Sequence, residues 1–257
     1  MKELEKKIYE IEVFGFTIVE NAISKKEAVS LKRHLKTALE LDMKKYDERP
    51  QKKEHHIVDL TSSAPIFLDL LDNDIMHEIF SRFLSDTCIL YTYSSTILRP
   101  NETIDVHAIH IDTPRLIPNY YYAMQMTLAL DDFTIENGAT YYLPGSHKSE
   151  LTPCEDIFNR YAVPTVRKAG DALFWNPRTY HRAGINSTDE TRFAVSTYAV
   201  RSFMKQRFDF PRVVPKENLK GVSERVKRFL GFNTRVPASI DEYYVSPENR
   251  LYKANQG

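Results

Sequence analysis

A change of pattern near residue 87 constrains the fold of this chain more than any other feature of its sequence. Before it, apolar residues recur at helical spacing; from about residue 88 to 200, nearly every apolar stretch has the composition of a short strand bounded by turns. Helices followed by many strands without intervening helices predict an antiparallel sandwich or barrel, with the helices packed against one face. The expected class is therefore mainly β with flanking helices.

The chain of 257 residues suits one domain, and we find no linker or internal repeat in it. We expect a helical and mixed part over 1–86, a β core over 87–200 and a C-terminal extension over 201–257. Within the first part, Ser24-Lys-Lys-Glu27 is a capping box that predicts the start of a helix. In the extension, residues 216–230 have a helical pattern, and the tyrosines of 239–252 are expected to pack on the helices or near the cavity mouth.

Composition excludes several classes of protein. Formal net charge is zero, so bulk attraction to nucleic acid or to an anionic membrane is not expected. The N-terminus is charged and lacks the apolar core of a signal peptide, and no apolar run approaches the ~20 residues of a membrane span. Two cysteines, Cys88 and Cys154, are too few for a disulfide framework. These features predict a cytoplasmic domain of the size of an enzyme, without a nucleic-acid partner or a membrane span; the oligomeric state stays open.

The predicted strand over 121–130 shows two different faces. Met124, Met126 and Leu128 alternate along one face, which we expect to lie on the helices. Gln125 and Thr127 lie on the other face, which is polar and small. An inward polar face inside a barrel usually borders a cavity.

His110-Ile-Asp112 places an imidazole and a carboxylate two residues apart, on one face of an extended segment. Such a pair can hold a metal ion from adjacent corners, and a third ligand is then needed. His181, which follows a predicted strand over 172–175 and the break at Asn176-Pro177, is the candidate. Two histidines and one carboxylate on one face of an octahedron are the arrangement of non-haem Fe(II) oxygenases. His107, three residues from His110, would face away from the metal.

Arg192 opens a predicted strand over 191–198, on the same face as Ala194 and Ser196. Beside such small residues an arginine has room to reach along a cavity. Its guanidinium offers two parallel donors to the two oxygens of a carboxylate. A surface arginine in an ion pair is the plainer interpretation of this residue taken alone.

Taken together and in this order, these motifs resemble the phytanoyl-CoA dioxygenase family of Fe(II)/2-oxoglutarate-dependent dioxygenases. The resemblance rests on His110-x-Asp112, Asn137-Gly138, Pro144-Gly-Ser-His147, Gly170-Asp171, His181, Asn186 and Arg192, and it spans roughly residues 8–250. It implies a double-stranded β-helix, or jelly roll, that binds Fe(II), 2-oxoglutarate and O2.

The resemblance also implies roles for single residues. His110, Asp112 and His181 match the metal-binding triad and are the expected catalytic centre. Arg192 matches the arginine that binds the distal carboxylate of 2-oxoglutarate, and Thr127 matches a position that lines the same pocket; we add its neighbour Gln125 as a candidate. Many members carry a serine two residues after the second histidine, where this chain has Ala183. His147 is not carried over as a ligand.

The expected reaction couples oxidative decarboxylation of 2-oxoglutarate, which yields succinate and CO2, to oxidation of a substrate C–H bond. Asp112 is retained, whereas related halogenases have a small residue there, so we expect hydroxylation or a related desaturation or cyclisation. Tyr121, Arg115 and Trp175 are candidates for substrate contacts, and the loops over 40–60, 113–120 and 201–250 are expected to face the substrate.

Two alternatives remain at this point. The chain could be a non-catalytic jelly-roll binding protein with a vestigial metal site, or a cupin-type enzyme that uses another divalent metal without a co-substrate. The second alternative leaves Arg192 unexplained. Free and carrier-bound substrates are both compatible with these residues.

Overall fold

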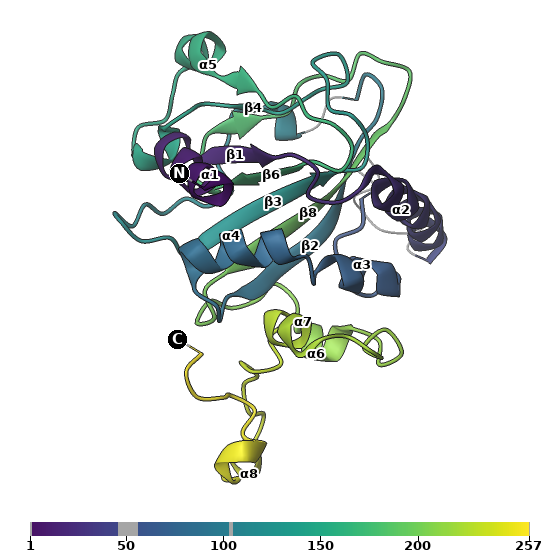
Figure 1. The fold of residues 1–257 in the computed structure, drawn as a ribbon, viewed down its shortest axis with the longest axis vertical. Helices are drawn as coiled ribbons and strands as arrows, with labels where there is room; N and C mark the ends of the chain where they lie inside the picture. Colours follow the sequence, from purple (N-terminus) through teal and green to yellow (C-terminus); the bar gives the residue numbers. More distant parts are fainter. Residues whose placement is uncertain (1, 46–55, 103–104, 257) are drawn as a thin grey trace.

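Two antiparallel sheets lie at the centre of the computed structural model, which describes residues 2–45, 56–102 and 105–256 (Figure 1). The larger sheet has the strand order β1-β6-β3-β8-β2, and the smaller has the order β5-β4-β7. The strands are β1 (Phe16–Val19), β2 (Ile89–Leu98), β3 (Ala123–Ala129), β4 (Tyr141–Tyr142), β5 (Val163–Pro164), β6 (Ala172–Trp175), β7 (His181–Arg182) and β8 (Arg192–Val200). The predicted change from helices to strands is confirmed.

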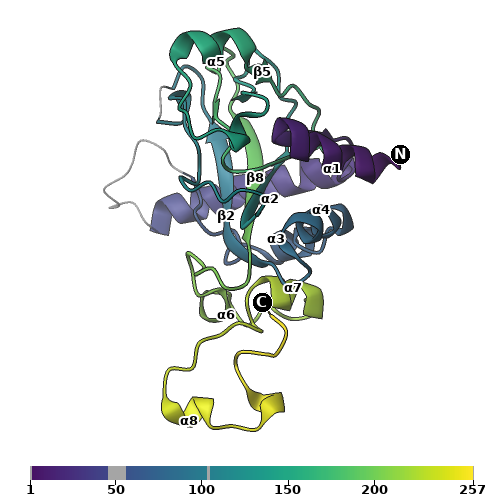
Figure 2. The ribbon, with the colours of Figure 1, turned by 90° about the vertical axis from the view of Figure 1, so that its left-hand side faces the viewer.

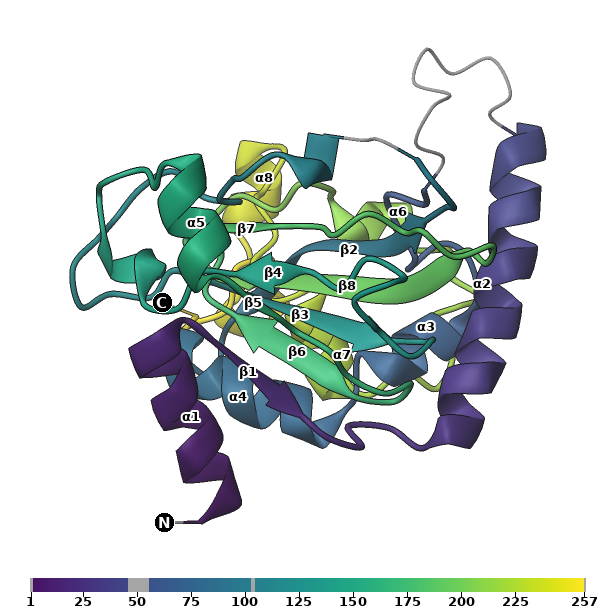
Figure 3. The ribbon, with the colours of Figure 1, turned by 90° about the horizontal axis from the view of Figure 1, so that it is seen from above.

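Helices cover the outer face of the larger sheet. Figure 1 shows α4 crossing that sheet, and Figures 2 and 3 show α1, α3 and α4 on the same side of it, with α2 along its end. The α-helices are α1 (Glu3–Phe14), α2 (Lys25–Lys45), α3 (Pro65–Leu70), α4 (Asp74–Leu84), α5 (Glu155–Tyr161), α6 (Phe210–Val213), α7 (Glu224–Phe229) and α8 (Ile240–Tyr243). Only α5 interrupts the strand-rich part with an α-helix, among the residues that the structure describes.

The two faces of β3 are used as the alternation predicts. Met124, Met126 and Leu128 are at most 2% exposed and belong to the main apolar core, together with residues of α1, α2, α3 and α4. Gln125 and Thr127 face the other way and line a cavity. The apolar face thus fastens the sheet to the helices, and the polar face remains available for a site.

The capping box at the start of α2 forms as predicted. The Ser24 backbone N–H donates to Glu27 Oε2 at 2.8 Å, and the Glu27 N–H donates to Ser24 Oγ at 3.2 Å. These bonds satisfy backbone donors that a helix start otherwise leaves unpaired. The amphipathic pattern that follows buries Leu31 and Leu35 in the core.

Two local predictions are wrong. His107 and His110 do not lie on one continuous strand, as the predicted orientation of His107 requires: Asp105–His107 form a 3-10 helix, and His110 makes only an isolated β-bridge. Residues 216–230 do not form one long helix, because turns occupy their first half and only α7, Glu224–Phe229, is helical. Gly221 interrupts the pattern with a φ of +78°, which a helix cannot contain.

The aromatic tail does not pack as predicted. Tyr243 and Tyr244 are 63% and 79% exposed, and α8 lies well away from both sheets in Figure 1. Tyr252 pairs instead with Thr234 in a β-bridge within the tail itself. The expected packing of these tyrosines near the cavity mouth is therefore wrong. No helix in the described ranges is long and apolar enough to cross a membrane.

Gly15 and His147 form a tight contact where α1 turns into β1. Gly15 has a φ of +89°, and a Cβ there would lie 2.6 Å from His147 Nδ1. His147 is 3% exposed, and its Nε2 donates to the Glu12 carbonyl at 3.3 Å. Burial in this place lowers the pKa of His147 to about 4. The imidazole is therefore neutral in the folded protein at neutral pH.

This contact predicts a loss of stability in acid. The pKa of His147 is about 4 in the folded protein and 6.5 in the ordinary case. Between these two pH values only the unfolded chain binds the proton, so stability falls as pH drops through 6.5. His147→Gln keeps a donor for Glu12 but cannot titrate. Between pH 7 and pH 5 the natural protein should lose about 2 kcal/mol more unfolding free energy than the variant. Urea unfolding at both pH values measures this, and equal losses would contradict it.

Candidate active site

Three side chains from two distant segments converge at one point. One ligand atom from each of His110, Asp112 and His181 lies within 4.8 Å of the others. Asp112 Oδ1 is 3.7 Å from His110 Nε2, and Asp112 Oδ2 is 3.6 Å from His181 Nε2. Among the described residues this is the one cluster of histidine, cysteine and carboxylate groups with such geometry. The structure thus brings together the three residues predicted from the sequence.

A backbone pairing places the two histidines side by side. The His110 N–H donates to the His181 carbonyl at 3.0 Å, and the His181 N–H donates back to the His110 carbonyl at 3.0 Å. The ring centroids are then 4.2 Å apart. The prediction that His110 and Asp112 share a face holds, although by a bridge and a bend instead of a strand.

Hydrogen bonds set which nitrogen of each ring is free. Nδ1 of His110 lies 2.8 Å from the Ala108 carbonyl, and Nδ1 of His181 lies 2.9 Å from the Thr179 carbonyl. A carbonyl only accepts, so each Nδ1 carries the proton and each Nε2 presents its lone pair to the centre of the cluster. Histidines that bind metals are commonly oriented by such a second hydrogen bond.

The Asp112 carboxylate is also fixed from behind. Its backbone N–H donates to the Pro177 carbonyl at 2.8 Å, and Gln125 Nε2 donates to Oδ2 at 2.5 Å. Gln125 therefore lies beside the cluster and orients the carboxylate. It also lines the cavity, and its predicted contact with the co-substrate stays a prediction.

Tyr142 holds His181 in place by stacking. The two rings are nearly parallel, at 7°, with centroids 5.0 Å apart. His181 is 6% exposed, and burial lowers its pKa below the ordinary value while Asp112 opposes that shift. At neutral pH the ring is thus neutral, which is the form that binds a metal ion.

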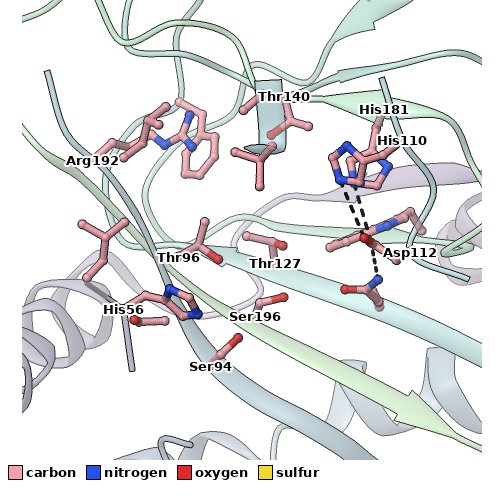
Figure 4. A pocket seen from close by; sticks show the side chains of 18 of the residues that line it. His56, Ser94, Thr96, His110, Asp112, Thr127, Thr140, His181, Arg192 and Ser196 are labelled. Atoms are coloured by element: carbon pink, nitrogen blue, oxygen red, sulfur yellow. Dashed lines mark hydrogen bonds and ion pairs between the residues drawn. The ribbon is translucent and has the colours of Figure 1, made fainter. Parts of the chain in front are cut away.

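A cavity of about 320 Å³ extends from the cluster over the polar face of the larger sheet. Its floor follows the strand register, in which Ser196 pairs with both Ser94 and Thr127, so three hydroxyl groups cross three strands in one row. Figure 4 shows Thr127 and Ser196 between the cluster and Arg192, with Thr140 above them.

Arg192 closes the cavity at the end opposite to the cluster (Figure 4). It is 4% exposed, and its Nη1 donates to the carbonyls of Asn137 and Gly138. Nε and Nη2, which form the two-donor edge of the guanidinium, have no hydrogen bond to any described residue. Burial, and then the nearby Arg167, lower the pKa of Arg192 to about 9, so it stays charged at neutral pH.

The three residues predicted to contact the substrate lie in different parts of the structure. Trp175 lines the cavity beside Gln125, its partner in the register of β3 and β6. Tyr121 lies in a second cavity of about 520 Å³ instead, and Arg115 is exposed and lines neither cavity. Their contacts with the substrate stay predictions. Of the loop predicted over 40–60, residues 40–45 belong to α2 instead, residues 46–55 fall outside the described residues, and His56 lines the cavity.

Phe133, Thr140 and Tyr142 are among the cavity-lining residues that sequence reasoning missed. Thr140 and Tyr142 are two residues apart in an extended stretch, so alternation could have placed both on one face. Phe133 has no such signal, because it follows the turn at Asp131-Asp132 and only tertiary packing brings it under Arg192.

Comparison with known proteins places these features in a family. The model of the phytanoyl-CoA dioxygenase family matches residues 11–194. An uncharacterised protein of Mycobacterium tuberculosis is 34% identical over 198 residues, which cover 75% of this chain and 72% of that protein. A dioxygenase of Gibberella moniliformis is 29% identical over 197 residues, which cover 70% of this chain and 64% of that protein.

Solved structures show the same fold. A non-haem α-ketoglutarate-dependent carbocyclase from nogalamycin biosynthesis aligns with a TM-score of 0.60 at 20% identity, over 76% of this chain and 83% of its own. HygX from Streptomyces hygroscopicus, with nickel and 2-oxoglutarate bound, aligns with a TM-score of 0.63 at 16% identity, over 78% and 88%. At these identities we take the fold alone from them, and the predicted jelly-roll core is confirmed.

The geometry of the cluster predicts which histidines a metal needs. Replacing His110, Asp112 or His181 by alanine should weaken Fe(II) binding by more than about 100-fold, since loss of a mere orienting partner already costs 10–100-fold. Equilibrium dialysis with anaerobic Fe(II) measures this, and circular dichroism reports whether the fold is kept. His107→Ala is the matched control and should bind iron normally. Loss of iron in that control would show that the ligand set is wrong.

Proposed function

We propose a function that starts from the family: this chain belongs to the phytanoyl-CoA dioxygenase family. It is by family an Fe(II)- and 2-oxoglutarate-dependent dioxygenase, as the motifs predicted. Within that class we infer that it hydroxylates a C–H bond of a small or carrier-linked metabolite, with release of succinate and CO2. The observation that carries this proposal is the pairing, in one cavity, of a three-ligand cluster with a buried arginine whose two-donor edge is free.

The donor set suits Fe(II). Two imidazole nitrogens and one carboxylate are the ligands of non-haem Fe(II) oxygenases, and they leave the remaining positions for the keto acid and O2. The iron, when bound, supplies the activation of O2 that an organic side chain cannot. The protein supplies the rest: His110 and His181 present Nε2, and Gln125 keeps the Asp112 carboxylate turned toward them.

Arg192 is placed to recognise the distal carboxylate of 2-oxoglutarate. A guanidinium edge binds a carboxylate through two parallel N–H donors, and in a buried site this pairing is strong. Thr127 and Thr140 line the cavity along the way from the cluster to Arg192. We propose that their hydroxyl groups border the co-substrate. Ala183 stands where many members have a serine and also lines the cavity, so this chain lacks that hydroxyl.

Hydroxylation is favoured over halogenation because the Asp112 carboxylate fills a ligand position that a halide would need. Desaturation and cyclisation use the same site and remain compatible with it. A vestigial site is disfavoured by the intact ligand orientation, and a metal enzyme without co-substrate leaves the buried Arg192 charge without a purpose. A small-molecule substrate and a cytoplasmic location stay predictions.

Succinate formation tests the function directly. Anaerobic addition of Fe(II) and 2-oxoglutarate should produce a metal-to-ligand charge-transfer absorption band, and exposure to O2 with ascorbate should then yield succinate. Uncoupled turnover is enough, so the substrate need not be known. A protein that shows neither the band nor succinate after loading with Fe(II) would be a binding protein, which is the alternative reading.

Replacement of Arg192 tests the co-substrate position. Arg192→Met should raise the dissociation constant of 2-oxoglutarate by about 10- to 300-fold, because a charge-assisted pair is lost and the carboxylate is left without a cation. Iron affinity should change little. Arg192→Lys should recover only part of the loss, since lysine keeps the charge without the two-donor geometry.

Arg201→Met is the matched control for this experiment. Arg201 follows the same strand, lies over the Tyr120 ring at 4.4 Å and donates to the carbonyls of Tyr121 and Phe83, yet it is not at the cavity. Its loss should leave 2-oxoglutarate binding unchanged. If Arg192→Met bound 2-oxoglutarate as tightly as the natural protein, the co-substrate assignment would be wrong.

A further inference from the structure

A second arginine, Arg167, is buried directly behind the Arg192 end of the cavity. It is 4% exposed, as Arg192 is, but it does not line the cavity. Its Nη1 donates to the Thr165 carbonyl at 3.0 Å and to Thr165 Oγ1 at 3.3 Å. Its buried Nε has no hydrogen-bond partner among the described residues. Neither Arg167 nor Arg192 lies within 4.0 Å of a described carboxylate oxygen.

Both guanidinium groups lie over one ring. The central carbon of Arg167 is 3.6 Å from the Phe133 centroid, and that of Arg192 is 3.9 Å from it. A group that packs on a ring lies about 3.5 Å above it, so these distances place both groups almost over the centre. Two groups cannot occupy one such position. They must lie on opposite faces, so Phe133 is held between two cations.

The Phe133 ring itself is fixed by its surroundings. Its backbone N–H donates to the Arg167 carbonyl at 2.7 Å, and the Arg167 N–H donates back at 3.1 Å. Its side chain is 1% exposed and clusters with Ala129, Ala139 and Ala194. These small residues leave the ring faces free for the two arginines. The sandwich is thus built into the fold by a backbone bridge and by the absence of larger neighbours.

Two buried cations with no ion-pair partner are costly, and an apolar residue would fill the place of Arg167 at lower cost. An arginine at this buried position therefore indicates that its positive charge has a role. Burial lowers the pKa of Arg167 to about 10, so it also remains charged at neutral pH. An anion that arrives next to Arg192 would be attracted by both charges.

We propose that Arg167 is a positioning residue for the dicarboxylate co-substrate. It presses Phe133 against the other guanidinium, so that Arg192, whose Nη1 is held by the carbonyls of Asn137 and Gly138, presents its Nε and Nη2 edge to the distal carboxylate. This inference rests on the proposed function, because it assigns Arg167 to the same co-substrate site. It adds a residue that does not touch the co-substrate.

The same arginine also steadies the adjoining wall. Thr165, which accepts from Arg167, donates through its N–H and its Oγ1 to the Thr140 carbonyl, at 2.9 and 2.8 Å. Thr140 lines the cavity between Arg192 and the metal cluster. Thr165 makes both of these bonds to Thr140 without Arg167, so the effect of losing Arg167 on the co-substrate is expected at Arg192.

The test compares two keto acids in the Fe(II)-loaded protein without oxygen. 2-Oxoglutarate has the distal carboxylate and 2-oxobutanoate lacks it, while both chelate the metal in the same way. Arg167→Met should raise the dissociation constant of 2-oxoglutarate by about 3- to 30-fold, the range expected when a desolvated cation–π contact is lost. The constant for 2-oxobutanoate and the affinity for Fe(II) should change by less than about twofold. The charge-transfer band reports both keto acids.

Further variants separate positioning from general damage. In an Arg192→Met background, Arg167→Met should cause no additional loss, because its effect passes through Arg192. Arg167→Lys keeps the charge without the planar stack and should recover only part of the affinity. If Arg167→Met fails to fold, Phe133→Leu tests the same stack and should show the same selective loss. Arg201→Met again serves as the matched stacked arginine away from the cavity and should change nothing.

The outcomes are distinguishable. Unchanged 2-oxoglutarate binding in Arg167→Met, equal losses for both keto acids, or a further loss in the Arg192→Met background would each overturn the role of Arg167. Failure of the unmodified Fe(II) protein to bind 2-oxoglutarate would overturn the proposed function itself.

Discussion

The reciprocal backbone hydrogen bonds between His110 and His181, both 3.0 Å long, are the contact on which the site depends. They join a loop that follows β2 to the start of β7 and set two rings 4.2 Å apart. His181 is paired in turn with Tyr142 across β4 and β7, so the small sheet carries the metal ligand. Because backbone hydrogen bonds hold the two histidines, the ligand pair needs little reorganisation when a metal binds.

One face of the larger sheet stabilises the fold, and the other face lines the cavity. On β3, Met124, Met126 and Leu128 join the apolar core, while Gln125 and Thr127 face the cavity. The same alternation on β8 gives Phe193 and Val195 to the core and Arg192 and Ser196 to the cavity. Because the alternation has a period of two, the cavity face can carry polar groups without loosening the contact with the helices.

Charge is distributed unequally along the cavity. Asp112 lies at one end, within hydrogen-bonding distance of Gln125, and the buried cations Arg192 and Arg167 lie at the other. A divalent metal would compensate the negative charge of Asp112, and a dicarboxylate would compensate the positive charges of the arginines. The Phe133 ring, held between two guanidinium groups at 3.6 and 3.9 Å, links Arg192 to Arg167, with which Phe133 also forms a backbone β-bridge. The charges at the two ends of the cavity thus set the orientation of a bound keto acid, with its distal carboxylate toward Arg192.

Much of this architecture follows from local sequence, because alternation and helical spacing are local properties of the chain. They placed the strands over 123–129, 172–175 and 192–200 to within a few residues, and they put Arg192 and Thr127 on the inward face. The triad was also found from the sequence, through residue types and order. Tertiary structure alone decided the bridge that joins His110 to His181, the exposed position of Tyr243 and Tyr244, and the place of Arg167. These depend on contacts between residues far apart in the chain, and a pattern of neighbouring residues carries no information on which distant segment will fill a given space.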